Sequence, residues 1–216
     1  MKLDWLKASV LVAAREHNPT ILHPAFLTAQ GIVPAEWELA KDPVCTPAFA
    51  AVSYRNRVTL VVEGSRFQVS EAGLRGLPEQ SPVAGLASAY LSKLPHVRYT
   101  EVEIRFQAFV PHDDPATFLI GRFLKGGPWN ASPQKLDAMG LRLEYSVDRA
   151  LLDLFLDPGS IMQDGVDRTG VIVGGSYSSE LPEANPLPQA QALLSLWPER
   201  CHHFVSAVNI AVRLGD

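Results

Sequence analysis

Three consecutive residues, Cys201, His202 and His203, carry side chains that bind metal ions. A metal site needs ligands that converge on one point, whereas adjacent residues of a helix point about 100° apart. The only other cysteine, Cys45, lies in a separate segment, and no further ligand pair has a metal-binding spacing. The sequence therefore favours a core Cys201 beside two half-exposed histidines. It predicts no metal, no cofactor and a fold that needs no disulfide.

Two other groups invite a chemical interpretation. His112-Asp113-Asp114 could supply acid–base chemistry, but Asp114 directly precedes Pro115, a pattern typical of a helix start, so Asp114 is predicted to be an N-cap. The segment 170–176 resembles a strand leading into a phosphate-binding loop. It lacks the Lys-Ser/Thr ending, and no helix follows it at once. A strand with a bulge at Gly174-Gly175 is the better prediction.

Catalytic signatures are missing from the sequence. Neither Ser176 nor Ser178 sits in a Gly-x-Ser-x-Gly elbow, and Asp164 and Asp167 lack the spacing of a calcium loop. The sequence favours a protein without enzymatic activity, although catalytic residues that only the fold brings together leave no motif. Trp129, in a Gly-Gly-Pro-Trp-Asn loop, is a candidate anchor for an interface; the alternative is that it caps the local core.

The composition is that of a folded, mildly acidic protein. Of 216 residues, 47% are hydrophobic and 19% charged, and the formal net charge is −4. Such a chain buries a core, and it has no basic cluster with which to bind nucleic acid. The N-terminal region contains neither a signal peptide nor a long apolar run, so we expect a soluble, cytoplasmic protein with no membrane partner.

Hydrophobic patterning predicts alternating strands and helices. Strands are expected at residues 6–15, 48–54, 58–63, 67–70, 98–110, 140–147, 150–156 and 170–177. Helices are expected at residues 24–30, 82–94, 115–124 and 189–214. The last helix contains Pro198, which predicts a kink or break near Trp197. Residues 32–46 and the Asp- and Gly-rich stretch 157–168 are predicted to be mostly loop.

The same order of elements occurs twice, as strand, short helix, three strands and long helix. We therefore expect one α+β domain over residues 1–216, made of two pseudo-repeats at about 1–95 and 96–216. The repeats would form one antiparallel sheet of about eight strands with two long helices on one face. This layout resembles folds like that of the TATA-binding protein, and it is also similar to helix-grip folds. Neither analogy carries a function.

Four segments carry a family resemblance: 32–34, Tyr54-Arg55-Asn56-Arg57-Val58, 99–102 and the terminal helix. They resemble a sporadically distributed family of uncharacterised bacterial proteins, over most of the chain. The resemblance implies no activity.

The most distinct pattern lies in 98–110, where apolar and polar residues alternate as in a half-buried strand. Charged rows cannot lie under helices, so we expect them on the open face of the sheet. The candidate interaction residues are Glu101, Glu103, Arg105, Gln107, Phe109, Arg142 and Glu144. We predict a non-catalytic interaction module, a subunit or adaptor of a larger bacterial assembly, that binds another protein chain or a second copy. The alternative is a small-molecule-binding domain with a pocket between the curved sheet and the C-terminal helix.

Overall fold

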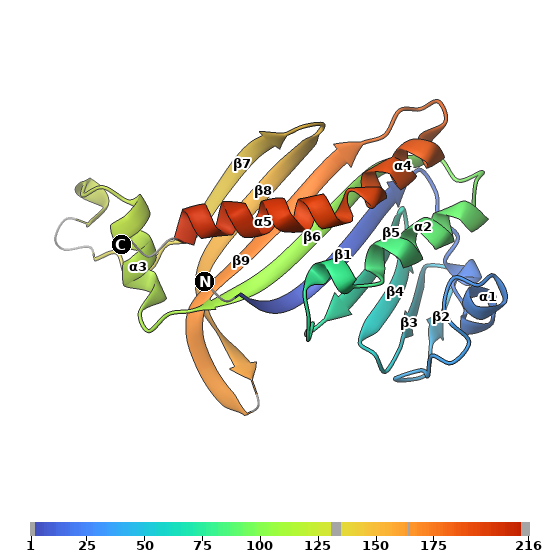
Figure 1. Ribbon diagram of the computed structural model, residues 1–216, viewed down its shortest axis with the longest axis horizontal. Coiled ribbons are helices and arrows are strands. Elements are labelled where there is room, and N and C mark those ends of the chain that lie inside the picture. Colours follow the sequence, from blue (N-terminus) through green and yellow to red (C-terminus); the bar gives the residue numbers. More distant parts are fainter. Residues whose placement is uncertain (1–2, 131–134, 164, 213–216) are drawn as a thin grey trace.

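One large antiparallel sheet organises the computed structural model, which describes residues 3–130, 135–163 and 165–212. Its nine strands have the order β2-β3-β4-β5-β1-β6-β9-β8-β7 (Figure 1). The strands are β1 (Asp4–Ala14), β2 (Val44–Cys45), β3 (Phe49–Ser53), β4 (Val58–Glu63), β5 (Arg66–Ala72), β6 (Tyr99–Pro111), β7 (Leu141–Val147), β8 (Ala150–Gln163) and β9 (Val166–Glu180). The predicted α+β class with a single antiparallel sheet is confirmed.

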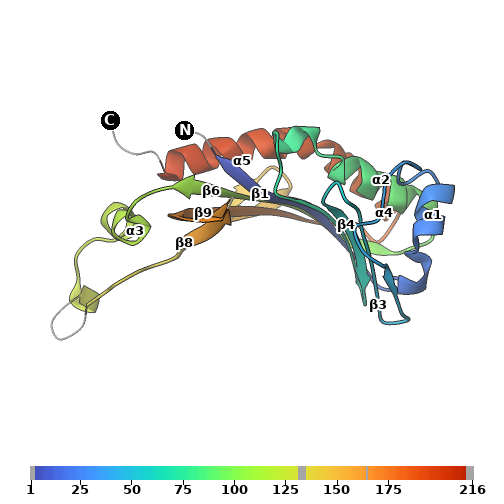
Figure 2. The same ribbon diagram turned by 90° about the horizontal axis from the view of Figure 1, so that it is seen from below.

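The helices α2, α4 and α5 cover one face of this sheet (Figures 1 and 2). The sheet curves away from them, so its other face is open and concave (Figure 2). The α-helices are α1 (Pro24–Ala29), α2 (Val83–Lys93), α3 (Pro115–Phe123), α4 (Pro186–Ser195) and α5 (Trp197–Val212). Short 3₁₀ turns are η1 (Pro19–Ile21), η2 (Pro78–Gln80) and η3 (Pro128–Asn130).

Strand β6 shows why the two faces differ. Val102, Ile104, Phe106 and Ala108 are buried in the helix-covered core, while Glu101 and Arg105 in the alternate row keep contact with solvent. Successive side chains of a strand point to opposite faces, so an alternating sequence leaves one face apolar and the other polar. The alternation predicted from the sequence is confirmed.

Aromatic rings fill the space between the sheet and α5. The ring of Phe106 lies 4.8 Å from that of Trp197 and 5.7 Å from that of Phe204, measured between centroids. Trp5 of β1 packs 5.8 Å from Phe204, and its neighbour Leu6 stands at an irregularity in the β1–β6 register. The indole N–H of Trp197 donates to the carbonyl of Pro78 at 2.8 Å, so this buried polar group is satisfied.

The predicted bulge at Gly174-Gly175 is wrong. Both glycines pair in regular register with β6 and β8. A Cβ on Gly174 would come within 2.1 Å of the Phe155 ring, and one on Gly175 within 2.6 Å of the Phe204 ring. These glycines therefore make room for an aromatic ring on each face of the sheet, which is the other common reason for glycine inside a strand.

Two segments predicted to be loops contain strands. Residues 157–163 and 165–168 belong to a hairpin, because β8 continues to Gln163 and β9 begins at Val166. Only the turn needs a special residue, and Gly165 supplies it with a φ of +80°. In the other segment, 32–46, Val44 and Cys45 form β2 against β3, so the sheet has nine strands rather than about eight.

The predicted break in the C-terminal helix is confirmed. Helix α4 ends at Ser195 and α5 begins at Trp197, with Pro198 in its first turn, where a proline removes no helical hydrogen bond. The predicted end of this helix at residue 214 lies outside the described residues.

The contact between Gly175 and Phe204 can be tested by substitution. Gly175→Ala should lower the free energy of unfolding by about 1–3 kcal/mol, because the new methyl group overlaps the Phe204 ring. In a Phe204→Leu background the same substitution should cost less, with a coupling of about 0.5–3 kcal/mol measured by denaturant unfolding. Strictly additive losses would contradict this packing.

Candidate functional site

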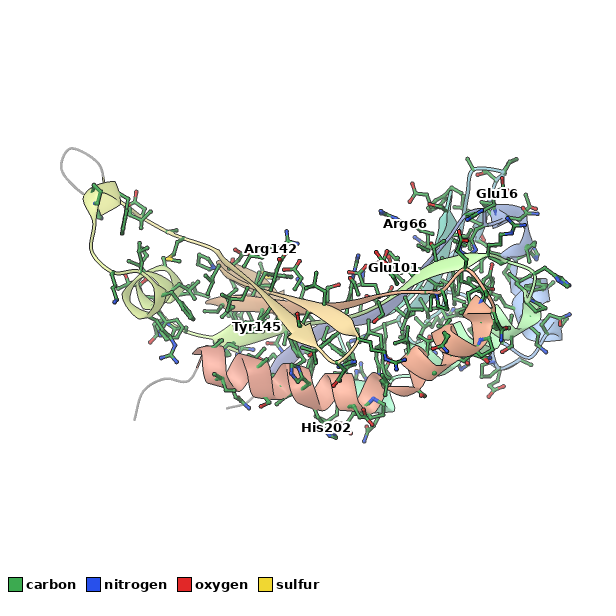
Figure 3. The ribbon with its side chains drawn as sticks, turned by 90° about the horizontal axis from the view of Figure 1, so that it is seen from above. Glu16, Arg66, Glu101, Arg142, Tyr145 and His202 are labelled. Atoms are coloured by element: carbon green, nitrogen blue, oxygen red, sulfur yellow. The ribbon has the colours of Figure 1, made fainter. Side chains whose placement is uncertain are left out.

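The concave face carries the row of polar β6 residues predicted from the sequence. Glu101, Glu103, Arg105 and Gln107 point away from the helices, and the sheet register continues from Arg105 through Ser176 and Asp153 to Glu144 on β7. Figure 3 shows Glu101, Arg142 and Arg66 on the concave side and His202 on the opposite side. The candidate residues of β6 and β7 therefore share one surface, across three strand spacings of about 4.8 Å each. We call this surface the open face.

Two ion pairs organise the charges of the open face. The carboxylate of Glu103 accepts hydrogen bonds from Arg105 and from the hydroxyl of Ser176, and its side chain is only 12% exposed, against 45% for Arg105. Arg142 donates through Nε to Asp153 at 2.7 Å and through a second nitrogen to the same carboxylate, which raises the pKa of Arg142. Glu103 lies on the predicted face, but Arg105 and Ser176 cover most of its side chain.

Phe109 is not the exposed apolar anchor that the sequence suggested. It lies in the predicted row but is fully buried. The guanidinium of Arg168 sits 5.6 Å from its ring centroid, and a Cβ on Gly170 would come within 2.6 Å of the ring. Arg168 was predicted to lie in a loop, and Gly170 was predicted to be the first residue of a strand. The β8–β9 hairpin is longer than predicted, and its residues cover Phe109.

Leu151 of β8 supplies an exposed apolar side chain on the open face instead. It is 47% exposed and lies between Ser146 of β7 and Ser178 of β9. The signal for it was present in the sequence, because Leu152, Leu154 and Leu156 are fully buried and the residues between them must face the other way.

The half of the open face formed by β6, β9, β8 and β7 is acidic. It carries six carboxylates and three guanidinium groups, a formal charge of 3 − 6 = −3: Glu101, Glu103, Glu144, Asp153, Asp157 and Glu180 against Arg105, Arg142 and Arg168. Arg168, farther along β9, also pairs with Asp4 of β1 at 2.8 Å. We call this region the acidic half.

Carboxylates oppose each other directly in the acidic half. Glu101 pairs with Glu180 across β6 and β9, and Glu144 pairs with Asp153 across β7 and β8. Like charges that face each other on neighbouring strands destabilise a sheet. Arg142 compensates the second pair by binding Asp153, whereas no described cation forms an ion pair with Glu101 or Glu180. The first pair therefore leaves an attractive position for a cation.

Trp129 lies away from the open face. It belongs to η3, in the segment that follows α3 beyond the end of the sheet (Figures 1 and 2), and it is 48% exposed. Its ring packs over Gly127, where a Cβ would come within 2.3 Å. The structure does not bring Trp129 together with the other candidate residues.

The Cys201-His202-His203 side chains diverge, as the helical geometry predicted. Cys201 is buried, and burial raises the pKa of its thiol to about 11. His202 contacts Glu79 at 2.7 Å, whereas Nδ1 of His203 lies 2.8 Å from the hydroxyl of Tyr177. Within the described ranges, no group of three or more His, Cys, Asp or Glu side chains could hold a metal ion.

The other polar group predicted to be structural is also seen in that role. Asp114 caps α3 by accepting a hydrogen bond from the backbone N–H of Thr117 at 3.1 Å. Hydrogen bonds from Thr117 lower the pKa of the Asp114 carboxyl. His112 accepts from the Asp114 backbone N–H at 3.0 Å, so this cluster caps the start of α3.

A groove of about 930 Å³ lies at one end of the sheet. It is formed by the start of β1, by residues 73–77 and by the tip of the β8–β9 hairpin, and Val205 of α5 touches it. It does not lie between the centre of the sheet and α5, where aromatic rings fill the space.

Comparison with known proteins adds no relative, since neither a protein-family model nor a curated protein matches the chain. The resemblance to a sporadically distributed bacterial family stays a prediction. In the described part of the chain, no helix combines the length and the apolar character that crossing a membrane requires.

The two thiols should differ sharply in reactivity. Cys45 is exposed and Cys201 is buried with a raised pKa, and both are free. Because the thiolate is the reactive form, one thiol should react rapidly with a chromogenic disulfide at neutral pH and the second only after unfolding. Cys45→Ala should abolish the fast phase. Two fast thiols in the folded protein would contradict the burial of Cys201.

The repulsion between Glu101 and Glu180 should lower the free energy of unfolding of the protein. Glu180→Gln should raise the free energy of unfolding by about 0.2–1 kcal/mol at low ionic strength, because it removes the repulsion from Glu101. Glu36→Gln, at an exposed glutamate in the loop after α1, makes the same charge change outside the sheet and should have little effect. Equal effects of the two substitutions would show that only net charge matters.

Proposed function

We propose that the protein is a non-catalytic interaction module, a subunit or adaptor whose open face binds a basic region of another protein chain. The observation that carries this proposal is the acidic half, with a formal charge of −3 on one sheet face. Electrostatic complementarity of this kind steers association and selects partners.

The opposed pair Glu101 and Glu180 favours a cationic partner in particular. Two facing carboxylates destabilise the free protein, and a lysine or arginine placed between them would be attracted by both and would relieve their repulsion. Leu151 offers an apolar contact on the same face at 47% exposure. Such a surface gives a partner directional pairing around a small apolar centre.

The packing under the middle of α5 argues against a ligand site at that place, whereas the groove of about 930 Å³ at the end of the sheet, lined in part by Trp5 and Val205, is where the ligand-binding alternative would have to be sought. A small-molecule site needs a cavity of several hundred Å³. In the structure, Trp5, Phe106, Trp197 and Phe204 occupy the space between the sheet and α5, with neighbouring ring centroids 4.8 to 5.8 Å apart. The acidic half also argues against nucleic acid as the partner, because an acidic surface repels phosphate groups. A cytoplasmic location stays a prediction.

We also propose that the sheet arose from an internal duplication, as in folds like that of the TATA-binding protein. The arrangement of the strands supports it. Strands β1 and β6 lie side by side at the centre, and β5, β4 and β3 follow outward from β1 as β9, β8 and β7 follow from β6. A short helix and a long helix occupy corresponding places in both halves of the sequence.

Charge reversal on the open face tests the proposed function. The partner is first captured from the native host with the wild-type chain, identified and purified. Glu101→Lys/Glu180→Lys keeps a like-charge pair on the same strands, so the fold is disturbed little, but it should weaken binding of that partner more than about tenfold. Calorimetry gives the dissociation constants, and rising salt should weaken the wild-type complex.

The matched control is Glu36→Lys/Glu199→Lys, which changes the net charge equally at exposed positions of a loop and of α5. It should leave the affinity within about twofold of the wild type. An open-face variant that folds and binds like the wild type would contradict the proposed function.

A further inference from the structure

Strand β7 ends the sheet with an unprotected edge. It has seven residues, contains neither proline nor lysine, and pairs with β8 without a register shift. No described strand pairs with its other side. The opposite edge is different, because β2 has only two residues and is flanked by Pro43 and Pro47. Proteins normally shorten or interrupt an edge that must stay free, as at β2, so β7 has the features of an edge that is paired.

The hairpin turn determines which backbone groups of β7 face outward. Val147 pairs with Ala150, so the loop consists of Asp148, with a φ of 54°, and Arg149. The residues that flank a two-residue loop form a hydrogen-bonded pair, and such pairs alternate along an antiparallel ladder. Val147, Tyr145, Leu143 and Leu141 therefore bond to β8. The N–H and C=O groups of Arg142, Glu144 and Ser146 point to the free side.

The sequence of β7 is complementary to itself when a two-fold axis passes beside Leu143. An antiparallel copy then places Arg142 of each chain opposite Glu144 of the other, and both pairs use outward-pointing backbone groups. Opposite charges across an antiparallel pair stabilise it. A two-fold axis at Arg142 or at Glu144 would oppose identical charges, and one at Tyr145 would place Glu144 opposite Ser146. Charge complementarity thus selects a single register within β7.

The helix-side row of β7 completes the fit. Tyr145 is 44% exposed, and Leu141 and Leu143 are only partly buried. Figure 3 shows Tyr145 on the side of the sheet away from Arg142. In the register centred on Leu143, the two Leu143 side chains meet at the axis, and each Tyr145 packs against Leu141 of the other chain. The partner would therefore cover the apolar row and satisfy the edge backbone together.

We propose that a second copy of this chain occupies the β7 edge, forming a two-fold dimer in which one sheet runs through both subunits. This inference is separate from the proposed function, because it rests on pairing at the β7 edge; Arg142 and Glu144 also lie on the open face, but the proposed function is tested at Glu101 and Glu180. The two can fail separately, since the open-face variants and the edge variants change different pairs of residues.

Single charge reversals on β7 test the dimer. The wild-type chain, of 23.6 kDa, should sediment at twice that mass at micromolar concentration. Arg142→Glu and Glu144→Arg each place like charges opposite one another twice, so each should raise the dissociation constant about tenfold or more. Mixing the two single variants should restore a one-to-one dimer, and the double variant Arg142→Glu/Glu144→Arg should dimerise alone. A monomeric wild-type chain, or single variants that remain dimers, would overturn the proposal.

Cysteine cross-linking tests the register and does not depend on charge. In a Cys45→Ala background, Leu143→Cys should form a disulfide-linked dimer on mild oxidation, because non-hydrogen-bonded partners lie about 4.5 Å apart between Cα atoms. Tyr145→Cys is the matched control, since its two copies would lie four residues, or about 13 Å, apart along the strands. Cross-linking at 145 but not at 143 would overturn the register.

Discussion

The alternation of side chains along β6 is the constraint on which the rest of the structure depends. This strand lies at the centre of the sheet, and its Val102, Ile104 and Phe106 must be covered. Helices α4 and α5 supply the cover, and Trp197 and Phe204 of α5 fill the space above Phe106. Because alternate residues point the other way, the charged row of β6 is left on the concave face. One strand thus fixes both where the core lies and which face carries the charged row.

Two glycines of β9 determine how closely aromatic rings approach the sheet on each of its faces. Gly175 lets Phe204 of α5 approach the sheet, and Gly174 leaves room for Phe155 on the open face. A larger residue at either position would push an aromatic ring away from the strand. The close approach of α5 is therefore set by a backbone position in β9 as well as by the apolar stripe of the helix.

Much of this arrangement was predictable from local patterns. The alternation in 98–110 gave the faces of β6, Pro198 gave the break before α5, and Asp114-Pro115 gave the start of α3, because each signal acts within a few residues. The fate of Phe109 was not predictable in the same way. Its burial depends on Arg168 and Gly170, which a hairpin brings to it from about sixty positions along the chain. Gly174 and Gly175 were assigned to a bulge for the same reason, since the rings of Phe155 and Phe204 that they accommodate are known only in the fold.

The juxtaposition of Glu101 and Glu180 could not be predicted from the sequence, because it depends on strand register. The sequence shows Glu101 and Glu180 as two unremarkable surface acids, and only the pairing of β6 with β9 places them face to face. Register follows from the buried row, since a shift by one residue would turn apolar side chains to solvent. The repulsion is thus a consequence of burying the core correctly. It persists at a surface position where a single substitution could relieve it.

The two proposed interfaces would reinforce each other geometrically. The acidic half includes β7, so a two-fold axis at the β7 edge would bring the acidic halves of two subunits together. Antiparallel edge pairing turns the second subunit about an axis perpendicular to the sheet, which keeps both open faces on the same side and all covering helices on the other. Arg142 would then serve Asp153 within its own chain and Glu144 across the axis, leaving Glu101 and Glu180 as the least compensated charges of each subunit. A basic partner that spans both subunits would meet two such sites in a symmetric arrangement. Two linked contacts of this kind bind more tightly than either alone, because the second forms at a high effective concentration.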